Sequence, residues 1–178
     1  MIYSEDKSVA IRAMERSDLK IVQAWRNNEN IRRYFREYRE FSIDQKETWY
    51  DNMIKDSRFE MFVIVDCKNE DEVIGVTGLT YIDFINHHAD VHFYIGKKDS
   101  WIDKVYAPKA IKIILNYGFG IMNLNKIWAE IYEIDILKLN FFENLGFSID
   151  ANLREHYFYQ GKYYTSHIMS ILRKEYQS

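Results

Sequence analysis

The segment from Ala89 to Phe147 constrains the fold of this chain more than any other. It reads in order as a strand, a polar loop, an amphipathic helix, a second strand and a second helix, and it ends on Leu145-Gly146-Phe147. A strand that leads into a helix N-terminus builds an anion site, because backbone N–H groups and the helix dipole both point at it. A ligand with a pyrophosphate and a long arm would fit such a site.

Length and composition predict one hydrophobic core. The chain has 178 residues, 47% of them hydrophobic, which is enough for a single domain over residues 1–178. The formal net charge is -3, whereas nucleic-acid-binding domains usually carry a basic face, so no nucleic-acid partner is expected. Cys67 is the one cysteine, which excludes an internal disulfide and a multi-cysteine metal site.

Neither a membrane nor a metal partner is expected. No run of about 18 apolar residues occurs, so no membrane-spanning helix is predicted. The first residues, Met1–Asp6, lack the apolar core of a signal peptide, which favours a cytoplasmic protein. His87 and His88 are adjacent on a predicted turn and point apart, with no acidic residue spaced to close a site, so we assign no metal.

The order of predicted elements is mixed. Hydrophobic alternation predicts strands, and apolar residues at helical spacing predict helices. The strands are expected at 9–13, 61–66, 74–81, 89–95, 126–131, 147–153 and 162–172, and the helices at 17–26, 30–36, 42–54, 108–122 and 135–145. Short polar turns between successive strands favour an antiparallel meander. We therefore predict an α+β fold, with a central mixed, mostly antiparallel sheet of about seven strands and helices on both faces.

Local signals mark several helix ends. Ser42 and Gln45 form a capping box, in which the serine oxygen accepts an early N–H and the glutamine reaches back. On the helix that follows, Lys46 and its charged neighbours are expected on a solvated face. Pro108 stands at a helix start, where its missing N–H is tolerated. Gly146 follows a helix end, where left-handed φ is common.

This ordered set of elements resembles the GNAT superfamily of acetyl-CoA-dependent N-acetyltransferases over about residues 9–174. The strand 89–95, the loop 100–107 and the segment 135–147 carry most of the resemblance. It implies an enzyme that moves an acetyl group from acetyl-CoA directly to a primary amine, without a covalent acyl-enzyme. Motifs in the N-terminal third, the strand 74–81 and the last hairpin resemble the branch of ribosomal-protein N-terminal and nucleotide-amino-sugar acetyltransferases.

The predicted catalytic residues are Asp90, His92 and Tyr132. Asp90 and His92 share one face of a strand, and the resemblance implies that Asp90 is a general base, because an ammonium must lose a proton before it attacks. His92 is a second candidate for base or proton relay, since its pKa lies near neutrality. Phe142 stands where family members often carry the tyrosine that protonates the leaving thiolate, so Tyr132 or water is expected to replace it. The alternatives are that Asp90 caps the strand and that His92 is merely packed.

The resemblance also implies the contacts of acetyl-CoA. The backbone of the strand is expected to hold the pantetheine arm, and the loop and the next helix the remaining parts; the residues are Phe93, Tyr94, Ile95, Trp101, Ile102, Asp103, Lys104, Val105, Tyr106, Ala107, Asp135 and Phe142. The loop lacks the glycines that usually approach the pyrophosphate. Asp103 is unfavourable beside a diphosphate unless its side chain turns away, whereas Lys104 and Lys109 offer positive charge.

The acceptor is expected to be an amine-bearing small molecule, such as a polyamine or an amino-sugar nucleotide, or a protein N-terminus. Its candidate contacts are Arg26, Arg36, Tyr38, Tyr81, Arg154 and His156. The resemblance makes a homodimer one possible assembly. Two other functions stay open: a non-catalytic CoA-binding or regulatory module, and an interaction protein with an empty cleft. All depend on one expectation, namely that the strands around Phe93 and Trp128 diverge enough to admit a thioester arm.

Overall fold

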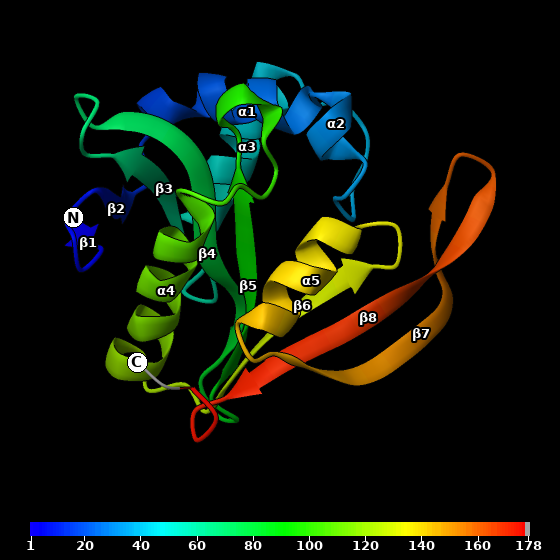
Figure 1. The fold of residues 1–178 in the computed structure, drawn as a ribbon. Coiled ribbons are helices and arrows are strands. Elements are labelled where there is room, and N and C mark those ends of the chain that lie inside the picture. Colours follow the sequence, from blue (N-terminus) through cyan, green and yellow to red (C-terminus); the bar gives the residue numbers. More distant parts are fainter. Residues whose placement is uncertain (177–178) are drawn as a thin grey trace.

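Eight strands form one sheet in the computed structural model, which describes residues 1–176 (Figure 1). The strands are β1 (Ile2–Tyr3), β2 (Val9–Ala13), β3 (Glu60–Asp66), β4 (Glu72–Asp83), β5 (His88–Ile95), β6 (Lys126–Tyr132), β7 (Ser148–Tyr159) and β8 (Lys162–Leu172). Their order is β1-β2-β3-β4-β5-β6-β8-β7. Only the β5–β6 pair is parallel, so the predicted mixed, mostly antiparallel sheet is confirmed. Two-residue β1 is the strand beyond the expected seven, since it is too short to show alternation.

Helices cover both faces of the sheet, as predicted. They are α1 (Leu19–Asn27), α2 (Glu29–Arg32), α3 (Ile43–Met53), α4 (Ala107–Asn116) and α5 (Ile136–Asn144), with short 3-10 turns at Arg16–Asp18 and Lys97–Asp99 and a π-helical turn at Tyr117–Ile121. One buried cluster joins the sheet to α1, α2 and α3, and the other joins it to α4 and α5. The polypeptide therefore has a three-layer arrangement.

The central strands are apolar on both faces because both faces are covered. On β3, Phe62 and Ile64 belong to the cluster under α4, whereas Val63 and Val65 belong to the cluster under α1. Successive side chains of a strand point to opposite faces. The near-continuous apolar run of β3 is thus explained by burial from two sides.

The predicted helix signals are confirmed where the structure tests them. Gln45 donates its backbone N–H to Ser42 Oγ at 3.2 Å, and the Ser42 N–H donates to Gln45 Oε1 at 2.9 Å. Pro108 lies in the first turn of α4, and Gly146 has φ +89°. The predicted helix at 30–36 is too long, because α2 ends at Arg32.

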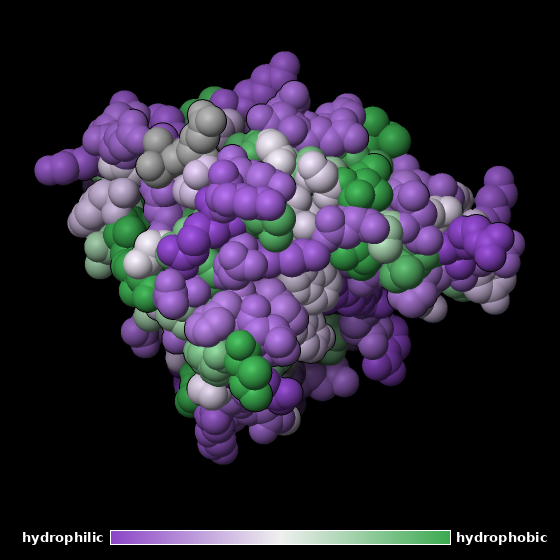
Figure 2. All heavy atoms as spheres, turned by 90° about the horizontal axis from the view of Figure 1, so that it is seen from below, coloured by the Kyte–Doolittle hydropathy of each residue, from purple (hydrophilic) through white to green (hydrophobic). Residues whose placement is uncertain are grey.

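The C-terminal hairpin is longer than predicted. β7 continues to Tyr159, six residues past the expected end, and β7 and β8 together extend away from the helices (Figure 1). The β7–β8 register shifts between Leu153 and Tyr157, so the alternation that marks a strand is interrupted there although pairing resumes. Figure 2 shows the molecule from below, where polar and charged side chains divide the apolar surface into small patches.

Gly96, at the end of β5, is closed in by a tryptophan. A Cβ atom at this position would lie 2.0 Å from Cδ2 of Trp25, a buried residue of α1. We expect Gly96→Ala to lower the stability by about 1–3 kcal/mol through overpacking, seen as a lower Tm in thermal unfolding. Gly120→Ala is the matched control, because nothing lies within 4 Å of its Cβ position. Equal Tm values for the two variants would contradict this account.

Candidate active site

The parallel pairing between β5 and β6 is short. It joins His88 to Lys126, Ala89 to Ile127 and Asp90 to Trp128, and then it ends. Beyond that point β5 stays paired with β4 as far as Ile95, and β6 stays paired with β8 as far as Tyr132. The two strands therefore diverge past Asp90, and the gap expected near Phe93 is confirmed.

Two groups of the chain itself bond to the free edge of β5 in this gap. Lys138, on α5, donates from Nζ to the backbone carbonyl of Phe93 at 3.0 Å. The Ile95 N–H donates to the carbonyl of Trp101 at 2.8 Å. These two backbone groups are among those expected to hold the pantetheine arm. A ligand can therefore bond to these two backbone groups of β5 only after both hydrogen bonds break.

Trp101 is a packed side chain rather than a mobile loop residue. It is 3% exposed, and its indole stacks on Tyr34 at 4.9 Å between ring centroids. Its Nε1–H donates to Asp135 Oδ2 at 2.8 Å. Asp135 also caps α5 by accepting from the Lys138 N–H, and burial raises the pKa of this carboxyl. Asp135 therefore holds the loop against α5.

The N-terminus of α4 already binds a carboxylate of the protein itself. Asp103 Oδ1 accepts from the N–H of Tyr106 at 2.9 Å and from the N–H of Ala107 at 2.7 Å. Lys109 is bound to Asp6 and Ser8 instead of pointing to this helix start. The first N–H groups of α4 are therefore occupied by Asp103 and would accept another anion only after its side chain turns away.

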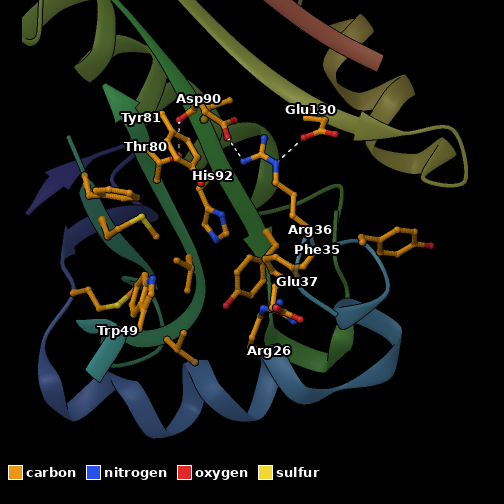
Figure 3. Close-up of a pocket in the computed structure, with 18 of the residues that line it drawn as sticks. Arg26, Phe35, Arg36, Glu37, Trp49, Thr80, Tyr81, Asp90, His92 and Glu130 are labelled. Atoms are coloured by element: carbon orange, nitrogen blue, oxygen red, sulfur yellow. Dashed lines mark hydrogen bonds and ion pairs between the residues drawn. The ribbon is translucent and has the colours of Figure 1, made fainter. Parts of the chain in front are cut away.

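A cavity of about 330 Å³ lies beside this gap (Figure 3). It is bounded by α1, the segment before α3, α3 itself, and strands β4 to β6. All three predicted catalytic residues, Asp90, His92 and Tyr132, line it. Trp101 and Lys138 line it as well, so the cavity and the gap share two side chains. Its size suits a small molecule.

Asp90 is one arm of a buried ion-pair network. Arg36 donates from Nη1 to Asp90 at 2.8 Å and from Nε to Glu130 at 2.7 Å, as the dashed lines in Figure 3 show. The two carboxylates are only 8% and 10% exposed. Burial raises the pKa of Asp90, and Arg36 opposes that rise. One oxygen of the Asp90 carboxylate is therefore bound to Arg36.

His92 lies in the middle of the cavity without a hydrogen bond from its ring to any other residue among positions 1–176 (Figure 3). It is half-buried and packs on Phe35 and Tyr94 at 5.7 and 5.6 Å between ring centroids. Burial, and then the positive charge of Lys138, lowers its pKa well below 6.5. At neutral pH the imidazole is uncharged, with a nitrogen lone pair available.

Tyr132, the predicted proton donor, differs in position from Phe142, which stands where family members often carry a tyrosine. Tyr132 lines the cavity and stacks on Tyr157 at 3.7 Å, and burial raises the pKa of its hydroxyl, which stays protonated. Phe142 is fully buried in the core beside Phe147 and does not line the cavity.

The predicted acceptor contacts divide into two groups. Arg26, Arg36 and Tyr81 line the cavity. Tyr38 instead lines a separate hollow beside the tip of the β7–β8 hairpin. Arg154 and His156 lie on β7 outside the cavity, although His156 Nε2 is 3.7 Å from Glu130. The motif of the last hairpin predicted that Arg154 and His156 contact the acceptor, but neither residue lines this cavity.

Three further lining residues were missed by the sequence reasoning, and each had a signal. Lys46 was expected on a solvated face, which is wrong, since it lines the cavity; it shares a helical face with Trp49 and Met53. Glu130 alternates on β6 with Trp128 and Tyr132, so it faces the same way as two aromatic rings. Lys138 follows the cap Asp135 by three residues, which places both in the first turn of α5.

No described helix is long and apolar enough to span a membrane. Within residues 1–176, no three His, Cys, Asp or Glu side chains are grouped so as to hold a metal ion.

Comparisons with known proteins agree on one family. The family model of the GNAT acetyltransferase domain matches residues 8–148. The spermidine N(1)-acetyltransferase of Vibrio cholerae is 30% identical over 171 residues, which are 96% of each chain. This relative is a spermidine acetyltransferase and not a member of the branch that the sequence motifs suggested.

Solved structures show the same fold. A crystal structure of spermidine N-acetyltransferase from Vibrio cholerae in complex with CoA and spermine has a TM-score of 0.87 at 30% identity, covering 95% of this chain and 98% of that one. A dodecameric structure from the same organism has a TM-score of 0.78 at 26% identity, covering 94% and 95%. The chain therefore belongs to the GNAT family and is an acetyl-CoA-dependent N-acetyltransferase.

Proposed function

We propose that this enzyme acetylates a primary amine of a small molecule bound in the cavity of Figure 3. The carrying observation is that Trp101 and Lys138 border both this cavity and the β5–β6 gap. A thioester in the gap and an amine in the cavity would therefore meet beside His92. A cavity volume of about 330 Å³ favours a small amine over a protein N-terminus.

His92 is the proposed proton acceptor in place of Asp90. The amine nitrogen attacks the thioester carbon, and the nitrogen of the tetrahedral adduct is much more acidic than a free ammonium. A neutral imidazole of low pKa is basic enough to take that proton. Asp90 acts indirectly: together with Glu130 it holds the Arg36 side chain in place.

Tyr132 is the proposed donor to the departing sulfur. The C–N bond forms and the C–S bond breaks, so one proton leaves nitrogen and one joins the thiolate. The Tyr132 hydroxyl lines the same cavity as His92 and is protonated at neutral pH. The proton taken by His92 returns to Tyr132 through water, which restores both groups.

Acetyl-CoA supplies the activated acetyl group, and the backbone of Phe93 to Ile95 would hold its arm. Binding requires Lys138 to release the Phe93 carbonyl and Trp101 to release the Ile95 N–H. The non-catalytic module considered above loses its main support, because the family comparisons show an enzyme. By analogy with the dodecameric relative we propose a multimer; the cytoplasmic location and the absence of a metal cofactor stay predictions.

Replacing His92 tests the proposed base. We expect His92→Gln to lower kcat about 10²-fold or more, within the range for loss of a general base. A base must be deprotonated, so wild-type activity is present above its pKa and falls as the pH drops. Because the pKa of His92 is well below 6.5, this acid limb lies below pH 6.5. It should vanish in the variant; an unchanged acid limb in kcat/KM profiles would exclude His92.

Asp90→Asn separates positioning from proton transfer. The charge that holds Arg36 is lost, so kcat should fall about tenfold, while the acid limb from His92 remains. Burial raises the pKa of Asp90 in the folded protein, so its ionised form contributes less stability as pH rises through that pKa. The neutral asparagine should therefore leave Tm at pH 7.5 unchanged or higher. Loss of the acid limb would restore Asp90 as the base.

Asp103→Asn tests whether the loop opposes cofactor binding. Asparagine can still accept from Tyr106 and Ala107, but it removes the negative charge at the start of α4. We expect the Kd of CoA in calorimetry to fall about fivefold, with a smaller difference at high salt. Asp99→Asn is the control, since this exposed residue carries the same charge away from the α4 N-terminus. An equal effect of both variants would show that only net charge matters.

A further inference from the structure

Two cations line the active-site cavity without a carboxylate partner. Arg26 comes from α1 and Lys46 from α3, and both lie toward the helical side of the cavity, whereas Asp90 and Glu130 lie toward the sheet (Figure 3 for Arg26). Within residues 1–176, neither cation has a carboxylate oxygen within 4.0 Å, whereas Arg36 has two such partners and Lys138 donates to the Phe93 carbonyl. Buried charges are normally paired, so this pair of cations requires an explanation.

Arg26 is the more buried of the two. It is 8% exposed, and its Nη1 has no hydrogen-bond partner. Its guanidinium lies over the ring of Phe35 at 4.1 Å and near that of Phe41 at 5.3 Å. Burial lowers its pKa to about 10. The rings hold the guanidinium in place without neutralising it, which leaves its charge directed at the cavity.

Lys46 completes the pair. Its Nζ lies 3.5 Å from the centroid of the Trp49 ring. Burial, with a further contribution from Arg26, lowers its pKa to about 7. An ammonium loses its proton this readily only where no anion supports it. The two side chains therefore form a basic end of the cavity, at which Arg26 is charged and Lys46 is partly protonated at pH 7.

The carboxylates that line the cavity are paired with other cations. Asp90 and Glu130 are both bound to Arg36, and Glu37 is bound to Arg39 at 2.7 Å. Each lining carboxylate among residues 1–176 thus already has a cationic partner. A polyamine would place its extra positive charges against Arg26 and Lys46.

We propose that the acceptor carries an anionic group, a carboxylate or a phosphate, in addition to its amine, and that Arg26 and Lys46 bind that group. This inference rests on the proposed function, because it names the substrate class of the same cavity. Arginine suits a carboxylate or phosphate through paired N–H donors, and lysine adds a point charge. The Trp49 and Phe35 rings border the space between this end and His92, so the body of the acceptor packs on aromatic surface.

The test compares amines that differ only by an anionic group. CoA release is measured with 6-aminohexanoate against hexylamine, which tests a carboxylate, with glucosamine 6-phosphate against glucosamine, which tests a phosphate, and with spermidine. We expect the anionic member of at least one pair to have kcat/KM about 10- to 100-fold above its neutral partner and above spermidine, as charged hydrogen bonds imply. The pair that responds identifies the anion.

Variants assign the effect to the two cations. Lys46→Gln and Arg26→Gln should each lower the ratio of kcat/KM between the anionic amine and its neutral partner about tenfold or more, mainly through the KM of the anionic amine. Lys55→Gln and Lys20→Gln are controls, because these exposed lysines carry the same charge outside the cavity. Thermal unfolding of each variant shows that it is folded.

Three results would overturn the inference. Spermidine could be the best acceptor, the anionic and neutral partners could be equal, or the control lysines could have the same effect as Lys46 and Arg26. In each of these cases acetyl transfer itself still stands. Absence of CoA release with every amine, together with no acetyl-CoA binding in calorimetry, would instead reject the proposed function, and this inference with it.

Discussion

The site depends on how little of β5 and β6 is paired. Three residue pairs hold these parallel strands together, and the ladder stops at Asp90 and Trp128. Each strand keeps its antiparallel partner on the other side, so the sheet opens without coming apart. The opening exposes backbone donors and acceptors that would otherwise bond within the sheet. The cavity lies where the opening begins, with the last paired residue, Asp90, in its wall.

Much of the fold followed from local patterns. The capping box at Ser42, the proline at the start of α4 and the glycine after α5 mark helix ends through backbone chemistry that few residues can satisfy. Short apolar runs between polar turns located β3 to β6, because both faces of these strands are buried against helices. The sequence pattern did not locate two-residue β1, which is too short to show a period, or the end of β7, where the register shifts.

The candidate site was less predictable, since its contacts join distant segments. The sequence placed Asp90, His92 and Tyr132 near the site, and all three line one cavity. The sequence could not show that Arg36 forms an ion pair with Asp90, because the two residues are 54 positions apart in the chain. The role of Lys46 was hidden for a similar reason: a lysine on an amphipathic helix is usually solvated, and only packing against the sheet encloses it.

The bonds that the chain makes along β5 have a consequence for affinity. Lys138, the Trp101 carbonyl and the Asp103 carboxylate bond to the backbone groups that we propose for the cofactor, so these groups are already satisfied without a ligand. A ligand therefore exchanges one set of hydrogen bonds for another, and the measured Kd equals the intrinsic constant divided by the fraction of molecules with the groove released. Substitutions in this loop can tune cofactor occupancy without touching the cofactor, which separates control of affinity from the chemistry at His92.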